Sequence, residues 1–130
     1  MKVRFLSLDE VLALQADQIE RYGGAPGVRD LGLLESAVAT AEVSFDGAYL
    51  HATIAEMAAA YFYHLAQNHA FVDGNKRVAA AATFMFLFLN HQVLACNEDE
   101  LVNLTLRVAS GKMTKAAAAV FLAAHVHPTR

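Results

Sequence analysis

The residue types best suited to chemistry gather in one short polar stretch between two apolar segments, His69-Ala70-Phe71-Val72-Asp73-Gly74-Asn75-Lys76-Arg77. Histidine is the residue type most often used as a general base, so His69 could accept a proton from an attacking hydroxyl group. Asp73 could hold Mg²⁺ together with phosphate oxygens, which is a common way for proteins to bind that metal. Phe71 lies between them and is expected to point into the core and fix the loop. This combination indicates proton abstraction beside a metal-bound phosphate.

The second half of the stretch suits an anion. If Gly74 and Asn75 begin a helix, its first backbone N–H groups have no partner within the helix and carry the positive end of the helix dipole. Gly74 has no Cβ that would keep a phosphate away from these groups. Lys76 and Arg77 add two cations that disfavour an isolated helix by roughly 0.3–1 kcal/mol each, so an anionic ligand is the simplest compensation. Together with the base and the metal ligand, this predicts a phosphoryl- or nucleotidyl-transfer site.

The elements that must position these residues are helices. The chain has 130 residues, 56% of them hydrophobic, and 26 are alanine, which favours helices over strands. This length suits one domain spanning residues 1–130, and no linker or internal repeat divides it. Helix starts are predicted from capping residues at Ser7 with Glu10, Asp30, Thr53 with Glu56, Asn97 with Glu100, and Thr114. The predicted fold class is therefore all-α.

The helix expected from residue 74 to about residue 90 is apolar almost all round. A helix without a polar face must be surrounded by others, so we expect it to be the buried central helix of a compact bundle. Between the other helices, Arg21–Asp30 is expected to be a connection built on Gly and Pro, and Ser44–Tyr49 a loop or short extended flap. The region around Pro128 is expected to be a frayed tail.

The composition also excludes several classes of protein. The net charge is -3, from 10 Lys and Arg against 13 Asp and Glu, so a broad nucleic-acid surface is not expected and we predict no direct DNA binding. Cys96 is the only cysteine, which excludes an internal disulfide and fits a reducing compartment. The most apolar run, Val78–Leu89, is too short to span a bilayer. These features predict a cytoplasmic protein without a membrane anchor.

The remaining histidines are weaker candidates. His69 by itself could be an ordinary loop histidine, and its functional interpretation depends on the residues around it. His64 lies on the preceding helix and is expected to have a capping or packing role. His125 and His127 could ligate a metal, but two ligands in a frayed tail make a weak site.

The polar stretch resembles the signature of the Fic/Doc family, His-x-Phe-x-(Asp/Glu)-Gly-Asn-(Gly/Lys)-Arg, and agrees with it at seven positions. The lysine at position 76 and the run Arg-Tyr-Gly-Gly-Ala-Pro-Gly-Val-Arg-Asp at 21–30 are similar to the death-on-curing (Doc) branch. Chain length and the order of the expected helices also match that branch. The resemblance implies a Fic-like helical bundle over nearly the whole chain.

Members of the Doc branch are toxins that phosphorylate a threonine of elongation factor Tu and so arrest translation. A small antitoxin of the prevent-host-death type silences them. The resemblance therefore implies a protein kinase toxin that uses ATP and Mg²⁺. It implies that His69 is the general base and Asp73 the Mg²⁺ ligand. The residues that would bind the nucleotide phosphates are Gly74, Asn75, Lys76 and Arg77, with Phe71 as the loop anchor.

Other Fic proteins transfer AMP instead, and two departures from their pattern bear on this alternative. Lys76 replaces a glycine and would crowd the anion pocket, and Ala80 stands where a second arginine usually binds phosphate. Both favour phosphoryl transfer, while AMP transfer and a non-catalytic nucleotide- or partner-binding module stay open. No glutamate is followed by glycine or asparagine, so the family's inhibitory motif is absent from this sequence. Control is therefore expected from a separate chain.

Overall fold

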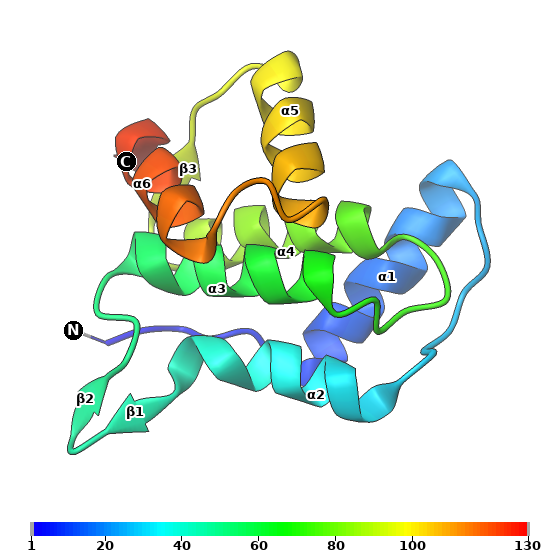
Figure 1. The fold of residues 1–130 in the computed structure, drawn as a ribbon, viewed down its shortest axis with the longest axis horizontal. Coiled ribbons are helices and arrows are strands. Elements are labelled where there is room, and N and C mark those ends of the chain that lie inside the picture. The colour runs from blue at the N-terminus through cyan, green and yellow to red at the C-terminus, as the bar shows by residue number, and fades with distance from the viewer. Residues whose placement is uncertain (1, 130) are drawn as a thin grey trace.

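The computed structural model describes residues 2–129. This part of the chain folds into six α-helices, one 3-10 turn and two small antiparallel sheets of two strands each (Figure 1). The elements are, in chain order, α1 (Leu8–Tyr22), α2 (Leu31–Ala39), the 3-10 turn η1 (Thr40–Glu42), β1 (Ser44–Phe45), β2 (Ala48–Tyr49), α3 (Ile54–Gln67), α4 (Asn75–Leu89), β3 (Gln92–Leu94), α5 (Glu98–Ala109), α6 (Lys115–His125) and β4 (Val126–Pro128). No helix among the described residues is both long and apolar enough to cross a membrane. The all-α prediction is confirmed.

Short polar side chains begin five of the helices, as predicted. Each accepts a hydrogen bond from the amide of the third helical residue, and these caps are Ser7, Asp30, Thr53, Asn97 and Thr114. At the starts of α1 and α5, the carboxylates of Glu10 and Glu100 complete the pair by accepting from the amide of the capping residue. Glu56 differs, because its carboxylate accepts from the Ala52 amide at 3.0 Å. Caps of this kind contribute about 1 kcal/mol each.

The helix at the centre of the bundle is α3, and not α4 as the sequence predicted. α3 packs against α2, η1, α4, α5 and α6 (Figure 1), and residues 57–62 are all buried. Three of these are the small residues Ala58–Ala60, which allow neighbouring helices to approach closely. α4 packs against α1, α3, α5 and β3, but it leaves Phe84 and Phe88 37% and 68% exposed. Apolar content alone therefore did not identify the central helix.

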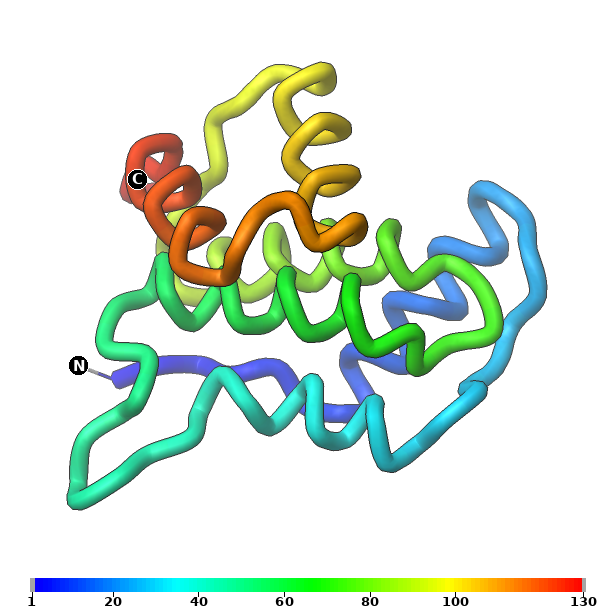
Figure 2. Tube along the Cα trace, viewed as in Figure 1, coloured from blue at the N-terminus to red at the C-terminus, as the bar shows by residue number. Residues whose placement is uncertain are grey.

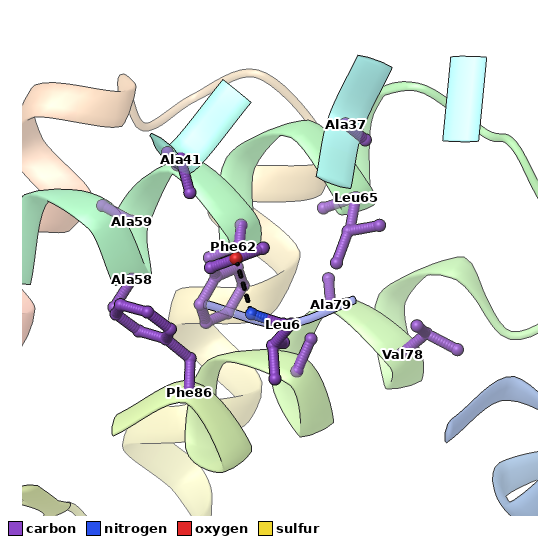
Figure 3. Packing of buried hydrophobic residues seen from close by; sticks show 14 of the residues in the cluster. Leu6, Ala37, Ala41, Ala58, Ala59, Phe62, Leu65, Val78, Ala79 and Phe86 are labelled. Carbon is purple, nitrogen blue, oxygen red and sulfur yellow. Dashed lines mark hydrogen bonds between the residues drawn. The ribbon is translucent and has the colours of Figure 1, made fainter. Parts of the chain in front are cut away.

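The N-terminal segment packs across the core beside α3 and α4. Phe5 and Tyr61 both lie near the Phe86 ring, with ring centroids 6.1 and 5.0 Å away. The Tyr61 hydroxyl accepts a hydrogen bond from the Leu6 amide at 2.9 Å, the dashed contact in Figure 3. Burial raises the pKa of Tyr61 to about 12. This bond satisfies a backbone donor that burial would otherwise leave without a partner.

The two sheets lie in segments where the sequence predicted no regular strand pairing. Asp46 (φ 53°) and Gly47 (φ 80°) form the two-residue turn between β1 and β2, so the expected flap is a short hairpin. The residues around Pro128 were expected to fray, and this prediction is wrong. They form β4, which pairs with β3 and places Val93 opposite His127. The pairing gives partners to backbone groups that a free tail would expose to water.

Tyr61→Phe tests the bond to the N-terminal segment. We expect the free energy of unfolding to fall by about 1–2 kcal/mol, because the buried Leu6 amide loses its acceptor. Urea denaturation followed by circular dichroism measures the change. Tyr63→Phe is the control, since this tyrosine is half-buried and its hydroxyl makes no hydrogen bond within residues 2–129. Equal destabilisation by both substitutions would show that the bond does not secure the segment.

Candidate active site

The polar stretch that joins α3 to α4 (residues 68–74, the site loop) lies beside the connection between α1 and α2 (residues 23–30, the connecting segment; Figure 2). The Arg29 and Asp30 amides both donate to the Ala70 carbonyl, at 2.7 and 3.0 Å. The Val72 amide donates to the Gly27 carbonyl at 3.0 Å. The two stretches are thus paired like a short piece of antiparallel sheet, and the connecting segment forms one wall of the site loop.

Within the site loop, the Asn75 side chain holds the backbone of Phe71. Its Oδ1 accepts from the Phe71 amide at 2.9 Å, and its Nδ2 donates to the Phe71 carbonyl at 3.0 Å. Phe71 is buried in the core, as predicted. Asn75 was predicted to bind phosphate, and its side chain also braces the loop through the Phe71 amide and carbonyl. One N–H of Nδ2 and the backbone N–H of Asn75 are left for an anion.

His69 is exposed on the site loop, and its backbone is in the left-handed region with φ 49°. For a residue other than glycine this conformation costs about 1–2 kcal/mol, so surrounding contacts must hold it in place. One such contact is visible: the His69 carbonyl accepts a hydrogen bond from Arg29 Nε at 2.7 Å. The imidazole lies at the surface of the site and not in the core.

The N-terminus of α4 is open. Gly74 is the capping residue, with φ 80° and ψ 15°, and α4 is the one helix of residues 2–129 whose start receives no hydrogen bond from a side chain. The left-handed backbone explains the glycine, because a Cβ at this position would meet nothing closer than 3.6 Å. The first-turn amides of α4 are left without partners and carry the positive end of the helix dipole. Such amides are able to bind an anion, and the sequence analysis predicts an anion at this position.

Asp73 does not cap α4 although it directly precedes Gly74. Its Oδ2 accepts from the Ala25 amide of the connecting segment at 2.8 Å. The other carboxylate oxygen makes no hydrogen bond within residues 2–129, and the side chain is exposed beside the open amides. Such a carboxylate fits Mg²⁺, which commonly takes one or two carboxylates together with substrate phosphates and water.

The two cations of the first turn of α4 differ in what they contact. Arg77 donates from Nη1 to the Gln18 carbonyl at 3.2 Å and from Nη2 to the Gly23 carbonyl at 3.0 Å, so it closes the C-terminal end of α1. It was expected to be a phosphate clamp, but α1 takes part of its guanidinium because the last carbonyls of a helix need donors. Lys76 is exposed and makes no hydrogen bond or ion pair within the described chain. Lys76 is the cation that is free to meet a ligand.

A cleft of about 490 Å³ collects these groups. It is lined by His69, Val72, Asp73, Gly74, Asn75, Lys76, Arg77, Leu106, Ala109 and Ser110. Six of the seven predicted site residues therefore share one cavity, and the seventh, Phe71, anchors the loop from the core. A smaller groove of about 250 Å³ adjoins it between α4 and α5, where Ala80 is a lining residue. The cleft places a candidate base, an anion site, a carboxylate and an ammonium group together.

The arrangement agrees with a comparison to known proteins. The family model of the Fic/DOC family matches residues 5–87. The chain belongs to this family. It is 44% identical over 92 residues to Toxin Doc of Mycolicibacterium smegmatis, covering 71% of this chain and 70% of that protein. It is 34% identical over 113 residues to Protein kinase doc of Escherichia phage P1, covering 86% of this chain and 87% of that protein.

Two contributors to this Fic/DOC site escaped the sequence analysis. Gln15 is 4% exposed on α1, and its side chain donates to the Asp73 carbonyl at 3.2 Å and accepts from the Gly27 amide at 3.4 Å. The signal that could have found it is a polar residue on the core-facing stripe of α1, where Val11 is also buried. The second is the α5 wall at Leu106, Ala109 and Ser110, for which no motif in the sequence gives a signal.

Other candidates lie outside the site. The segment Ser44–Tyr49, predicted to be a loop or flap, is a hairpin at the N-terminal end of α3, whereas the site loop lies at the other end of that helix (Figure 1). A 14-residue helix is about 21 Å long, so the hairpin cannot border the cleft. His64 packs as expected, with Nε2 3.3 Å from Lys115 Nζ, and burial together with this cation lowers its pKa. His125 stacks on Phe121, and residues 2–129 hold no group of three or more metal-binding side chains.

Asn75→Ala tests the internal brace of the site loop. We expect the free energy of unfolding to fall by about 1–3 kcal/mol, because the Phe71 peptide loses both partners. The measurement is the midpoint and slope of urea unfolding. Asn68→Ala is the matched control, because this neighbouring asparagine donates one bond of 3.3 Å, to the Leu33 carbonyl. If Asn75→Ala is no more destabilising than Asn68→Ala, the brace is dispensable for stability.

Proposed function

We propose that this protein is the toxin of a toxin–antitoxin pair and acts as an ATP-dependent protein kinase. Its substrate would be a threonine hydroxyl of a translation factor, elongation factor Tu, so that phosphorylation arrests translation. The observation that carries the proposal is the exposed imidazole of His69 in one cleft with the open amides of α4 and the free ammonium of Lys76. Similarity to proteins named Toxin Doc and Protein kinase doc supports the same activity.

Each of these residues of the cleft has a separate role in phosphoryl transfer. The open amides of residues 75–77 hold phosphate oxygens of ATP. His69 accepts the proton of the threonine hydroxyl as its oxygen bonds to the γ-phosphorus. The bond from that phosphorus to the β,γ-bridging oxygen breaks, and the oxygen leaves with the electron pair as part of ADP. Lys76 offsets the negative charge on the transferring group.

Asp73 would hold Mg²⁺ in this site, and the ion supplies positive charge next to the phosphates when it is bound. The connecting segment fixes where that carboxylate lies, because the Ala25 amide takes one of its oxygens. Gln15 fixes the backbone of the same residue from the other side through the Asp73 carbonyl. Asp73 is thus positioned by contacts that do not depend on a ligand.

Two residues favour phosphoryl transfer over AMP transfer. Lys76 lines both the cleft and the groove between α4 and α5, so its side chain occupies space next to the anion site. Ala80 lines the same groove and offers no guanidinium to a second phosphate. Because position 80 supplies no phosphate-binding guanidinium and the Lys76 side chain narrows the anion site, the nucleotide is better placed to present its γ-phosphate to the acceptor. AMP transfer by the same residues is the alternative that the experiment below separates.

A separate antitoxin of the prevent-host-death type completes the proposal. The sequence has no inhibitory motif of its own, since none of its glutamates is followed by glycine or asparagine. Contact with operator DNA is assigned to that antitoxin, because a chain of net charge -3 without a basic run is a poor binder of the DNA backbone. Since the proposed substrate belongs to the translation machinery, the protein is expected to act in the cytoplasm.

Labelled ATP tests both the reaction and the base. Incubation with purified elongation factor Tu and Mg²⁺ is expected to transfer label from [γ-³²P]ATP and none from [α-³²P]ATP. His69→Ala is expected to slow the transfer by at least about 100-fold, because a general base contributes factors of that order. The rate of ³²P incorporation into the target is the measurement.

His91→Ala is the matched control for that substitution. His91 is also exposed and also has a left-handed backbone, with φ 64°, but it lies beyond the C-terminal end of α4. Its replacement should leave the transfer rate unchanged. Label from the α-phosphate would mean that the site transfers AMP, and no label from either position would favour a non-catalytic module.

A further inference from the structure

The backbone of the site loop is secured at almost every residue by groups that are themselves fixed. The Ala70 carbonyl and the Val72 amide pair with backbone of the connecting segment, and the Phe71 peptide is held by Asn75. The Asp73 carbonyl is held by the buried side chain of Gln15. His69 is the exception, because its carbonyl is held by the side chain of an exposed residue, Arg29, at 2.7 Å.

We propose that Arg29 is a positioning residue of the site, which orients His69 by a hydrogen bond from Nε to the His69 carbonyl. The inference rests on the proposed function in so far as His69 acts as the base. It assigns Arg29 no contact with ATP, metal or target.

The backbone geometry gives this bond its importance. Asn68 ends α3 in a right-handed conformation, with φ -76° and ψ -15°, and His69 follows at φ 49°. The chain therefore reverses handedness at the candidate base, in a conformation that residues with a Cβ leave unless neighbours hold it. A hydrogen bond from a guanidinium to a carbonyl is charge-assisted and therefore stronger than one between two neutral groups. It fixes the peptide that follows His69 and with it the direction of the imidazole.

Arg29 is well placed for this task. Its own amide donates to the Ala70 carbonyl at 2.7 Å, so its backbone is anchored whatever side chain it carries. Two adjacent carbonyls of the site loop, at residues 69 and 70, thus receive the side chain and the amide of one residue. The terminal nitrogens of Arg29 make no hydrogen bond within residues 2–129, so Nε carries the contact. A substitution of the side chain removes that one bond and leaves the pairing of the two segments in place.

The chemistry of the bond suggests a matched pair of substitutions. In Arg29→Gln, the amide nitrogen lies the same number of bonds from Cα as Nε does, so a donor is kept while the charge is lost. In Arg29→Met, a methyl group takes that place, so length is kept while both donor and charge are lost. Comparison of the two separates the hydrogen bond from a general effect of positive charge beside the site.

With elongation factor Tu as the target and ATP labelled at the γ-phosphate, Arg29→Met is expected to lower kcat about 10-fold, which corresponds to about 1.4 kcal/mol. The KM for ATP should stay within about two-fold of wild type, since the anion site is untouched. Arg29→Gln is expected to keep kcat within about two-fold of wild type. Equal loss in both variants would overturn the proposal in favour of a role for charge, and no loss in Arg29→Met would overturn it outright.

Amide hydrogen exchange gives a readout that does not require activity. Peptides covering residues 68–73 should exchange about 10-fold faster in Arg29→Met than in wild type or Arg29→Gln, while those from α3 and α4 stay unchanged. Identical exchange in all three proteins would mean that the bond does not hold the loop. If wild type transfers no label but the exchange difference appears, the proposed function fails and the positioning role of Arg29 stands.

Discussion

The candidate site depends on the backbone N–H groups in the first turn of α4, which have no hydrogen-bond partner among the described residues. Five helices begin with a side-chain cap, and α4 begins with Gly74 and none. The carboxylate of Asp73 is the nearest side chain that could cap α4, but it accepts a hydrogen bond from the Ala25 amide instead. Unpaired N–H donors and the positive end of a helix dipole both attract negative charge. An anion is therefore bound more favourably at this uncapped start than at the capped starts of the other helices. The other features of the site keep these amides accessible and place reactive groups around them.

Rigidity of the site loop comes from residues far away in the sequence. Gln15, Ala25, Gly27 and Arg29 all precede the residues that they contact by 40 positions or more, and they bond to the loop backbone or to the Asp73 side chain. A polar loop between two helices must find partners for its peptide groups, and the connecting segment supplies those of the His69 and Ala70 carbonyls and of the Val72 amide. The same contacts that satisfy the loop also fix the candidate base and the candidate metal ligand, so stability and function share one network.

Much of the fold and of the candidate site could be predicted from the sequence. The predictions that were wrong or incomplete have physical reasons. Helix starts at Ser7, Asp30 and Asn97 were predictable because capping is local, and residues 69–77 indicated a candidate site because their chemistry is unusual at that spacing. The roles of Asn75 and Arg77 were not readable, since each depends on a carbonyl brought near by folding. The same is true of the α5 wall and of the pairing of β3 with β4, which are contacts between distant parts of the chain. Hydrophobicity singled out α4 as the central helix because apolar content does not show which helix the others pack against, and that depends on contacts between distant parts of the chain.

The pairing between the connecting segment and the site loop also constrains the length of the connecting segment in this chain. Surface connections between helices ordinarily tolerate insertions and deletions during evolution. One residue added between Gly23 and Arg29 would move Ala25 away from Asp73 and Gly27 away from Val72 in a single step. The stretch that looks most like a spacer in this chain is therefore constrained in length, and a change in that length would disturb the site loop without altering any residue of the cleft.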